Sequence, residues 1–212
     1  MHLRILCFGA SITAGWSKGG THFYPYSSQV SARVADELPT THFGIDLNGF
    51  SGDTLIDGHY TPRMYQAMKD TYPTAYDWII IQAGGNDLAQ NKGSPEQIFD
   101  AMKELWEIPL SMGSKVLALT VTEHGNDDAE KSAKRQQLND MVLRHQAKNF
   151  FVVDLAKGIP WQAMPLDQRM AIWSDDTHFT KEGYVVMGDL IADRLIELTK
   201  GSSHGLVSSS KL

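Results

Sequence analysis

The chain has 212 residues, of which 42% are hydrophobic and 21% are charged, and its formal net charge is -6. This composition is ordinary for a globular protein, and the length fits a single α/β domain. The acidic balance and the lack of a Lys/Arg cluster argue against nucleic acid as a partner, because phosphate binding requires a basic face. The single cysteine, Cys7, excludes an intramolecular disulfide and lies in an apolar run that predicts a core position.

The two ends of the chain bear on where in the cell the protein is expected. The first apolar stretch is short and is interrupted by Arg4, which is not the plan of a signal peptide. No run approaches the roughly 18 apolar residues of a membrane span. The last three residues are Ser-Lys-Leu, the address that the peroxisomal import receptor reads. We therefore expect an intracellular chain, peroxisomal with that receptor as a partner if the source is eukaryotic, and cytoplasmic otherwise.

Short apolar runs rich in β-branched residues alternate with longer segments of helical periodicity. The predicted strands are residues 3–9, 41–47, 77–85, 115–121 and 150–155. The predicted helices are residues 25–38, 54–69, 95–111, 127–148 and 180–199. Strands that alternate with helices predict a parallel sheet covered on both faces. The expected fold is a three-layer α/β/α, flavodoxin-like domain with five parallel strands over residues 1–200, followed by a flexible tail over 201–212.

The first predicted strand ends at Gly-Ala-Ser, which places Ser11 at the carboxyl edge of the sheet, where ligands bind in folds of this kind. Small neighbours surround it, namely Gly9, Ala10, Ala14 and Gly15. They allow a tight turn and a close approach of backbone N–H groups to a substrate. Ser11 is therefore a candidate nucleophile, and a simple helix N-cap is the alternative.

A serine needs a base to become a nucleophile, and the last loop before the final helix supplies a candidate. Asp175 and His178 are three residues apart in "DDTH", so the carboxylate can reach one ring nitrogen and leave the other for the serine. Asp176 is the second carboxylate to consider, but its separation of two residues should point it away. A solvated surface pair is the other interpretation of this loop.

Hydrolysis of an ester also needs hydrogen-bond donors where the oxyanion forms. Gly52 follows the second strand in "NGFSGDTL" and can offer its backbone N–H. Asn86 follows the third strand in "AGGNDL" and can offer its side-chain amide. A turn glycine and a loop cap are the alternatives, but both residues belong to the same predicted sheet edge as Ser11 and His178.

These four blocks together resemble those of the SGNH hydrolases, the GDSL-type esterases and lipases. The similar segments are "FGASITAG", "GFSGDT", "GGND" and "DDTHFTKEGY", and they span residues 5 to 188. The resemblance implies a flavodoxin-like fold and hydrolysis without a metal or cofactor. It also implies Ser11, His178 and Asp175 as the catalytic triad, with Ser11, Gly52 and Asn86 as the oxyanion hole.

One residue departs from the family pattern, because Ala10 stands where the first block usually has Asp. That Asp is not a triad member, so the nucleophile is retained. The departure changes the hydrogen bonding that holds the turn, and Asp53 and Asp87 are candidates to replace part of it.

The expected function is a serine esterase that acts on small-molecule esters with short to medium acyl chains. An acyl-CoA thioesterase of the peroxisome and a catalytically idle binding module with the same fold are the alternatives. The expected substrate contacts are four aromatic side chains near the sheet edge, namely Trp16, Tyr24, Trp161 and Phe179.

Overall fold

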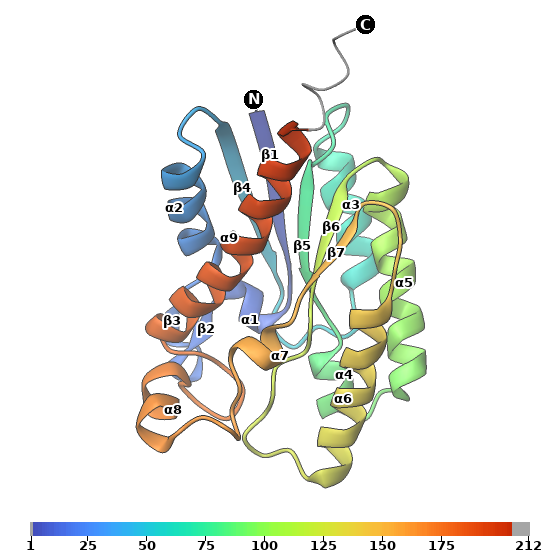
Figure 1. The fold of residues 1–212 in the computed structure, drawn as a ribbon. Coiled ribbons are helices and arrows are strands. Elements are labelled where there is room, and N and C mark those ends of the chain that lie inside the picture. Colours follow the sequence, from blue (N-terminus) through green and yellow to red (C-terminus); the bar gives the residue numbers. More distant parts are fainter. Residues whose placement is uncertain (1, 205–212) are drawn as a thin grey trace, which may run out of the picture.

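The structure is a computed structural model that describes residues 2–204 (Figure 1). Its centre is a five-stranded parallel sheet with the strand order β4-β1-β5-β6-β7. The strands are β1 (His2–Gly9), β4 (His42–Gly49), β5 (Trp78–Gln82), β6 (Lys115–Leu119) and β7 (Phe150–Val153). Because the first strand of the sheet lies between the second and the third, the order is flavodoxin-like, as the sequence predicts.

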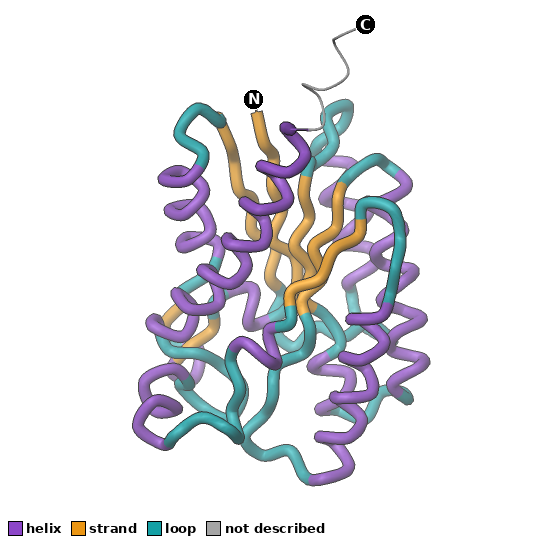
Figure 2. Tube along the Cα trace, in the orientation of Figure 1, coloured by secondary structure: helices purple, strands orange, loops and turns teal. Residues whose placement is uncertain are grey.

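Helices cover both faces of the sheet (Figure 2). One face carries α2 (Ser27–Glu37) and α9 (Lys181–His204), and the other carries α3 (Tyr60–Asp70), α5 (Pro95–Ser111) and α6 (Ala129–Arg144). Side chains of β1 alternate between the two resulting cores, since Ile5 and Cys7 pack with α2 and α9, whereas Leu6 and Phe8 pack with α3 and α5. The burial of both faces explains the nearly continuous apolar runs of these strands.

Local sequence signals predict the start of one helix correctly and the start of another incorrectly. α5 begins at Pro95 as predicted, because Ser94 and Gln97 form a reciprocal capping box. The helix predicted over 54–69 begins later, at Tyr60. The carboxylate of Asp53 accepts the backbone N–H of Thr54 at 3.1 Å and that of His59 at 2.6 Å, so residues 54–59 form turns and bends rather than helix. The predicted start at residue 54 is therefore wrong by about a turn and a half.

Short elements outside the five strands and five helices predicted above gather around the carboxyl ends of the strands, at the lower end of Figure 1. They are α1 (Ser11–Ala14), β2 (Trp16–Ser17), η1 (Lys18–Gly20), β3 (His22–Phe23), α4 (Gly85–Ala89), α7 (Leu155–Gly158) and α8 (Leu166–Ile172). No helix within residues 2–204 is both long and apolar enough to cross a membrane. The Ser-Lys-Leu at the end of the chain lies outside the described residues.

Candidate active site

Ser11 is the first residue of α1, directly after the end of β1. The N-cap position belongs to Ala10, and no side chain caps this helix, so Ser11 does not act as a cap. Its hydroxyl oxygen Oγ lies 2.9 Å from Nε2 of His178, although the two residues are 167 positions apart in the chain. The serine is 9% exposed. It is therefore held at the sheet edge with its hydroxyl against an imidazole.

The small residues around Ser11 are required by backbone packing. A Cβ on Gly9 would lie 2.2 Å from Oγ1 of Thr13 and 2.8 Å from the carbonyl oxygen of Gln82. Gly15 ends α1 with a φ of +81°, in the left-handed region that favours glycine, and a Cβ there would meet the nitrogen of Pro25 at 2.2 Å. The turn after β1 can thus be this tight only with glycine at both positions.

His178 is oriented by Asp175. Nδ1 of the imidazole lies 3.0 Å from Oδ1 and 3.1 Å from Oδ2 of that carboxylate. When Nδ1 carries the proton, its N–H donates a hydrogen bond to the carboxylate, and Nε2 is left as the acceptor that faces Ser11. Asp176 is turned away, because its Oδ1 lies beside Gly125, whose N–H donates to the Asp176 carbonyl oxygen at 2.8 Å.

The Asp175 carboxylate is held in its charged form. Partial burial raises the pKa of this carboxyl group, but hydrogen bonds from the backbone N–H groups of His178, at 2.7 Å, and Thr177, at 2.9 Å, act in the other direction. The neighbouring imidazole also favours the charge, and the pKa of Asp175 ends below its usual value. A carboxylate that stays ionised can stabilise a protonated His178.

Three potential hydrogen-bond donors belong to residues that line one cavity, namely Ser11, Gly52 and Asn86. Gly52 occupies the third position of a turn closed by the Asp53 N–H and the Phe50 carbonyl oxygen at 3.2 Å, and its φ of +80° is that of a type II turn. The turn hydrogen bond does not use the Gly52 N–H. The Asn86 side chain is fixed by a 2.8 Å hydrogen bond from Nδ2 to the Asp53 carbonyl oxygen. Ser11 adds its own N–H, because the first residues of a helix have no partner within the helix.

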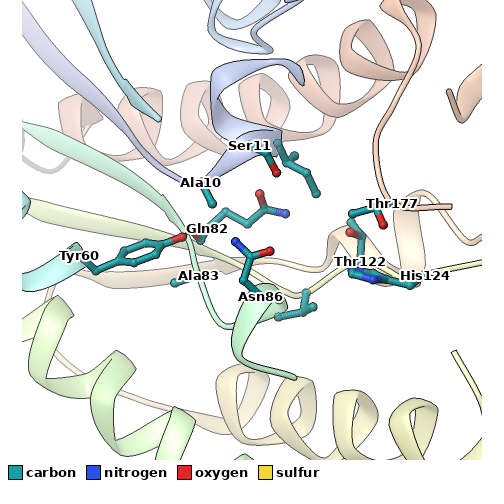
Figure 3. Close-up of a pocket in the computed structure, with 12 residues that line it drawn as sticks. Ala10, Ser11, Tyr60, Gln82, Ala83, Asn86, Thr122, His124 and Thr177 are labelled. Carbon is teal, nitrogen blue, oxygen red and sulfur yellow. Dashed lines mark hydrogen bonds between the residues drawn. The ribbon is translucent and has the colours of Figure 1, made fainter. Parts of the chain in front are cut away.

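Two cavities meet at Ser11. The wider one has a volume of about 520 Å³, and its lining includes Ser11, Gly52, Asn86, His178, Trp16 and Lys131. The narrower one has a volume of about 30 Å³, and its lining includes residues of α1, of the end of β5, of α4 and of the loop after β6 (Figure 3). The serine, the imidazole and the donors therefore face a space into which a substrate can enter.

Sequence and structure comparisons agree on the relationship of this chain to known proteins. The model of the GDSL-like lipase/acylhydrolase family matches residues 7–186. The chain belongs to the GDSL-like lipase/acylhydrolase family. No curated protein sequence matches the chain.

Solved structures with the same fold share little sequence with this member of the family. A lipolytic G-D-S-L protein from Veillonella parvula superposes with a TM-score of 0.72 at 18% identity, covering 90% of this chain and 97% of that one. A carbohydrate esterase family 3 protein from Talaromyces cellulolyticus gives 0.69 at 16% identity, with coverages of 94% and 99%. The acetylxylan esterase Axe2 from Geobacillus stearothermophilus gives 0.65 at 16%, with coverages of 92% and 94%.

The departure from the GDSL pattern at Ala10 is accompanied by two buried carboxylates that hold the Gly52 loop. Asp53 is paired with Arg63, whose guanidinium also donates to the Gly9 carbonyl oxygen at 3.0 Å. Asp87 accepts the N–H groups of Leu55 at 2.9 Å and Ile56 at 3.0 Å. Burial raises the pKa of the Asp87 carboxyl group, and these two donors oppose that shift. The loop after β4 is thus anchored without a carboxylate at position 10.

The four aromatic residues expected to contact substrate have different places. Trp16 lines the wide cavity, with its ring centroid 5.9 Å from that of His178. Tyr24 stacks on His22 outside this cavity, and Trp161 packs against Trp173 at a centroid distance of 5.1 Å. Phe179 is fully buried in the core beneath α9. The sequence placed all four near the sheet edge, but it could not indicate which side of the loop each ring faces.

His124 lines the site although the sequence analysis gives it no role. It lies in the loop after β6, at the carboxyl edge of the sheet, where ligands bind in folds of this kind. It lines both cavities. Burial lowers the pKa of its imidazole, and the nearby Asp127 acts in the opposite direction. His124 thus brings a second imidazole, which burial keeps neutral, to the site. The described part of the chain contains no group of three or more His, Cys, Asp or Glu side chains placed to hold a metal ion.

Proposed function

We propose that this GDSL-family chain is a serine esterase that hydrolyses carboxylic esters with short to medium acyl chains through an acyl-enzyme. The observation that carries the proposal is the continuous line of contacts from Asp175 to Ser11. The carboxylate lies 3.0 Å from Nδ1 of His178, and Nε2 of the same ring lies 2.9 Å from the serine hydroxyl. A base oriented by a third group and in contact with a hydroxyl is the arrangement that makes a serine nucleophilic.

In the first half of the reaction, Ser11 Oγ attacks the ester carbonyl carbon while Nε2 of His178 takes the hydroxyl proton. The negative charge that develops on the carbonyl oxygen is stabilised by the N–H groups of Ser11 and Gly52 and by the Asn86 amide. Asp175 stabilises the imidazolium. The C–O bond to the alcohol then breaks, and His178 gives its proton to the leaving oxygen.

In the second half, a water molecule attacks the acyl-enzyme. His178 takes a proton from the water, the same donors stabilise the second oxyanion, and the Ser11 oxygen leaves with the proton from His178. The acid product is released and the free hydroxyl is restored. No other reactant is needed for the atoms to balance.

The residues that line the wide cavity favour one kind of alcohol as the leaving group of the ester. Trp16 offers an aromatic face, and Lys131, Asn126 and Asp127 offer polar groups on the same cavity. A cavity that combines an aromatic side chain with hydrogen-bonding groups suits a polar ring, and two proteins of the same fold are described as a carbohydrate esterase and an acetylxylan esterase. We therefore include esters of sugars among the candidate substrates.

The test is hydrolysis of a p-nitrophenyl ester series, from acetate to palmitate, by the parent protein and by Ser11→Ala. We expect turnover of the short esters by the parent and a loss of about 10⁴- to 10⁶-fold in kcat in the variant. Ser28→Ala, at an exposed serine of α2, is the matched control and should retain full activity. Equal rates for the parent and Ser11→Ala would overturn the assignment. A parent that is inactive and resists a serine-directed phosphonate would favour the idle binding module.

A further inference from the structure

The two cavities at Ser11 differ in which catalytic groups they contain. His178 lines the wide cavity of about 520 Å³ but is absent from the lining of the narrow one, whereas Ser11 and Asn86 line both. In the proposed reaction His178 must hand its proton to the leaving oxygen, so the alcohol side of the scissile bond belongs in the wide cavity. The acyl side is left for the narrow cavity.

The narrow cavity limits the size of the acyl group. Its volume is about 30 Å³. One water molecule needs roughly 10–15 Å³, so only about two to three groups of that size fit into the cavity. An acetyl, propionyl or hydroxyacetyl group is small enough for this space, and we expect longer chains to be disfavoured.

The narrow cavity is also lined by the polar side chains of Gln82 and Thr122. Gln82, at the end of β5, is 8% exposed, and its side-chain amide extends between Ser11 and Asn86 (Figure 3). The Gln82 backbone carbonyl oxygen accepts the Tyr60 hydroxyl at 3.0 Å, which leaves the side-chain amide as the part of Gln82 that faces the cavity. Thr122 is 1% exposed, and its Oγ1 has no partner within the described chain.

Donors and acceptors that lose their water when a ligand binds discriminate strongly between ligands that can pair with them and ligands that cannot. A purely hydrocarbon acyl group would leave Gln82 and Thr122 unpaired after binding. An acyl group that carries a hydroxyl can pair with one or both of them, while Ile12 and Val121, on the same cavity, contact its carbon atoms.

We propose that the narrow cavity is a subsite for 2-hydroxyacyl groups of two or three carbons, such as glycolyl and lactyl, with Gln82 and Thr122 as its specificity-determining residues. This inference rests on the proposed esterase function and narrows its substrate class. The ester hydrolysed is then one that joins a small hydroxy acid to the larger alcohol held in the wide cavity.

The experiment compares two esters of similar size with one alcohol, benzyl glycolate and benzyl propionate, by following acid release in a pH-stat. The quantity of interest is the ratio of their kcat/KM values in the parent, in Gln82→Met and in Thr122→Val. Both replacements keep the approximate size of the side chain and remove its hydrogen-bonding atoms. Because the intrinsic reactivity of the two esters is the same for every variant, a change in the ratio reports the subsite alone.

We expect the glycolate-to-propionate ratio to fall about 10-fold in each variant, with the thermal midpoint recorded to show that each remains folded. Gln136→Met, at an exposed position of α6, should leave the ratio unchanged. The parent should also lose about 100-fold in kcat/KM from benzyl propionate to benzyl hexanoate. Thr122→Val carries the test independently if Gln82→Met does not fold.

The possible failures can be told apart. Hydrolysis that depends on Ser11 but shows the same ratio in the parent and both variants would overturn the subsite and leave the esterase intact. Rates for hexanoate equal to those for propionate would overturn the size limit and with it the assignment of the acyl side. Failure to hydrolyse any ester would overturn the proposed function and the subsite together.

Discussion

Arg63 joins three segments beneath the site, and replacing it tests whether a buried ion pair holds the Gly52 loop. Its guanidinium lies 2.5 Å from Oδ2 of Asp53 and donates to the carbonyl oxygens of Gly9 at 3.0 Å and Asn48 at 2.8 Å. The Arg63 side chain is 15% exposed and that of Asp53 is 0% exposed. Arg63→Met therefore leaves a buried carboxylate without its countercharge.

Loss of one partner of a buried pair costs about 3–5 kcal/mol of unfolding free energy. The Asp53 carboxylate keeps its hydrogen bonds from Thr54 and His59, which places the expected loss near the lower end of that range. For a chain of this length each kcal/mol corresponds to about 2–4 °C in the thermal midpoint, so Arg63→Met should melt about 6–12 °C below the parent.

The assay is urea unfolding followed by tryptophan fluorescence, together with a thermal scan. Arg33→Met is the matched control, because Arg33 also pairs with two carboxylates, Asp189 and Asp193, but its side chain is 30% exposed. That variant should lose no more than about 1 kcal/mol, since solvent screens exposed ion pairs. Equal losses in Arg63→Met and Arg33→Met would refute the claim that burial makes the Arg63–Asp53 pair structurally important.

Three further predictions concern the site itself. Asn86→Ala should lower kcat by about 10²- to 10³-fold in steady-state assays, and an unchanged kcat would remove it from the oxyanion hole. Asp175→Asn should lower kcat by about 10⁴-fold while the protein remains folded, because the wrong tautomer of His178 then faces the serine; a loss under 10-fold would contradict this role. Burial lowers the pKa of the His124 imidazole in the folded chain. As the pH falls below about 6.5, this imidazole is therefore protonated in the unfolded chain before it is protonated in the folded chain, and the parent loses stability. In urea titrations between pH 7 and 5, His124→Gln should lose less stability than the parent. Equal losses of stability in the two proteins would contradict the lowered pKa of His124.

The sequence predicts the sheet well because the signals for it are local. Runs such as "WIII" and "FFVV" are apolar throughout, which is the pattern of strands buried on both faces, and the polar blocks follow directly at their ends. The strand order and the family are confirmed. The sequence also predicts that Ser11, His178 and Asp175 lie close together, because parallel strands bring their carboxyl ends to the same edge of the sheet.

What the sequence could not provide depends on contacts between distant segments. Asp53 directly precedes the helix predicted over 54–69, but its pairing with Arg63 and its hydrogen bonds from Thr54 and His59 make it the anchor of a loop. Phe179 follows His178 directly and its ring faces the opposite way, into the core. Gln82 looks like one more residue of a buried strand, and only the structure shows that its amide reaches the narrow cavity.

The most direct test of the account is to identify the residue that carries the acyl group. The parent protein is mixed with p-nitrophenyl acetate or a serine-directed phosphonate, quenched in acid and mapped by peptide mass spectrometry. The account predicts one adduct per chain on the peptide that contains Ser11, and loss of that adduct in His178→Gln. An adduct on any other side chain, or turnover of ester without labelling by either reagent, would contradict Ser11 as the nucleophile.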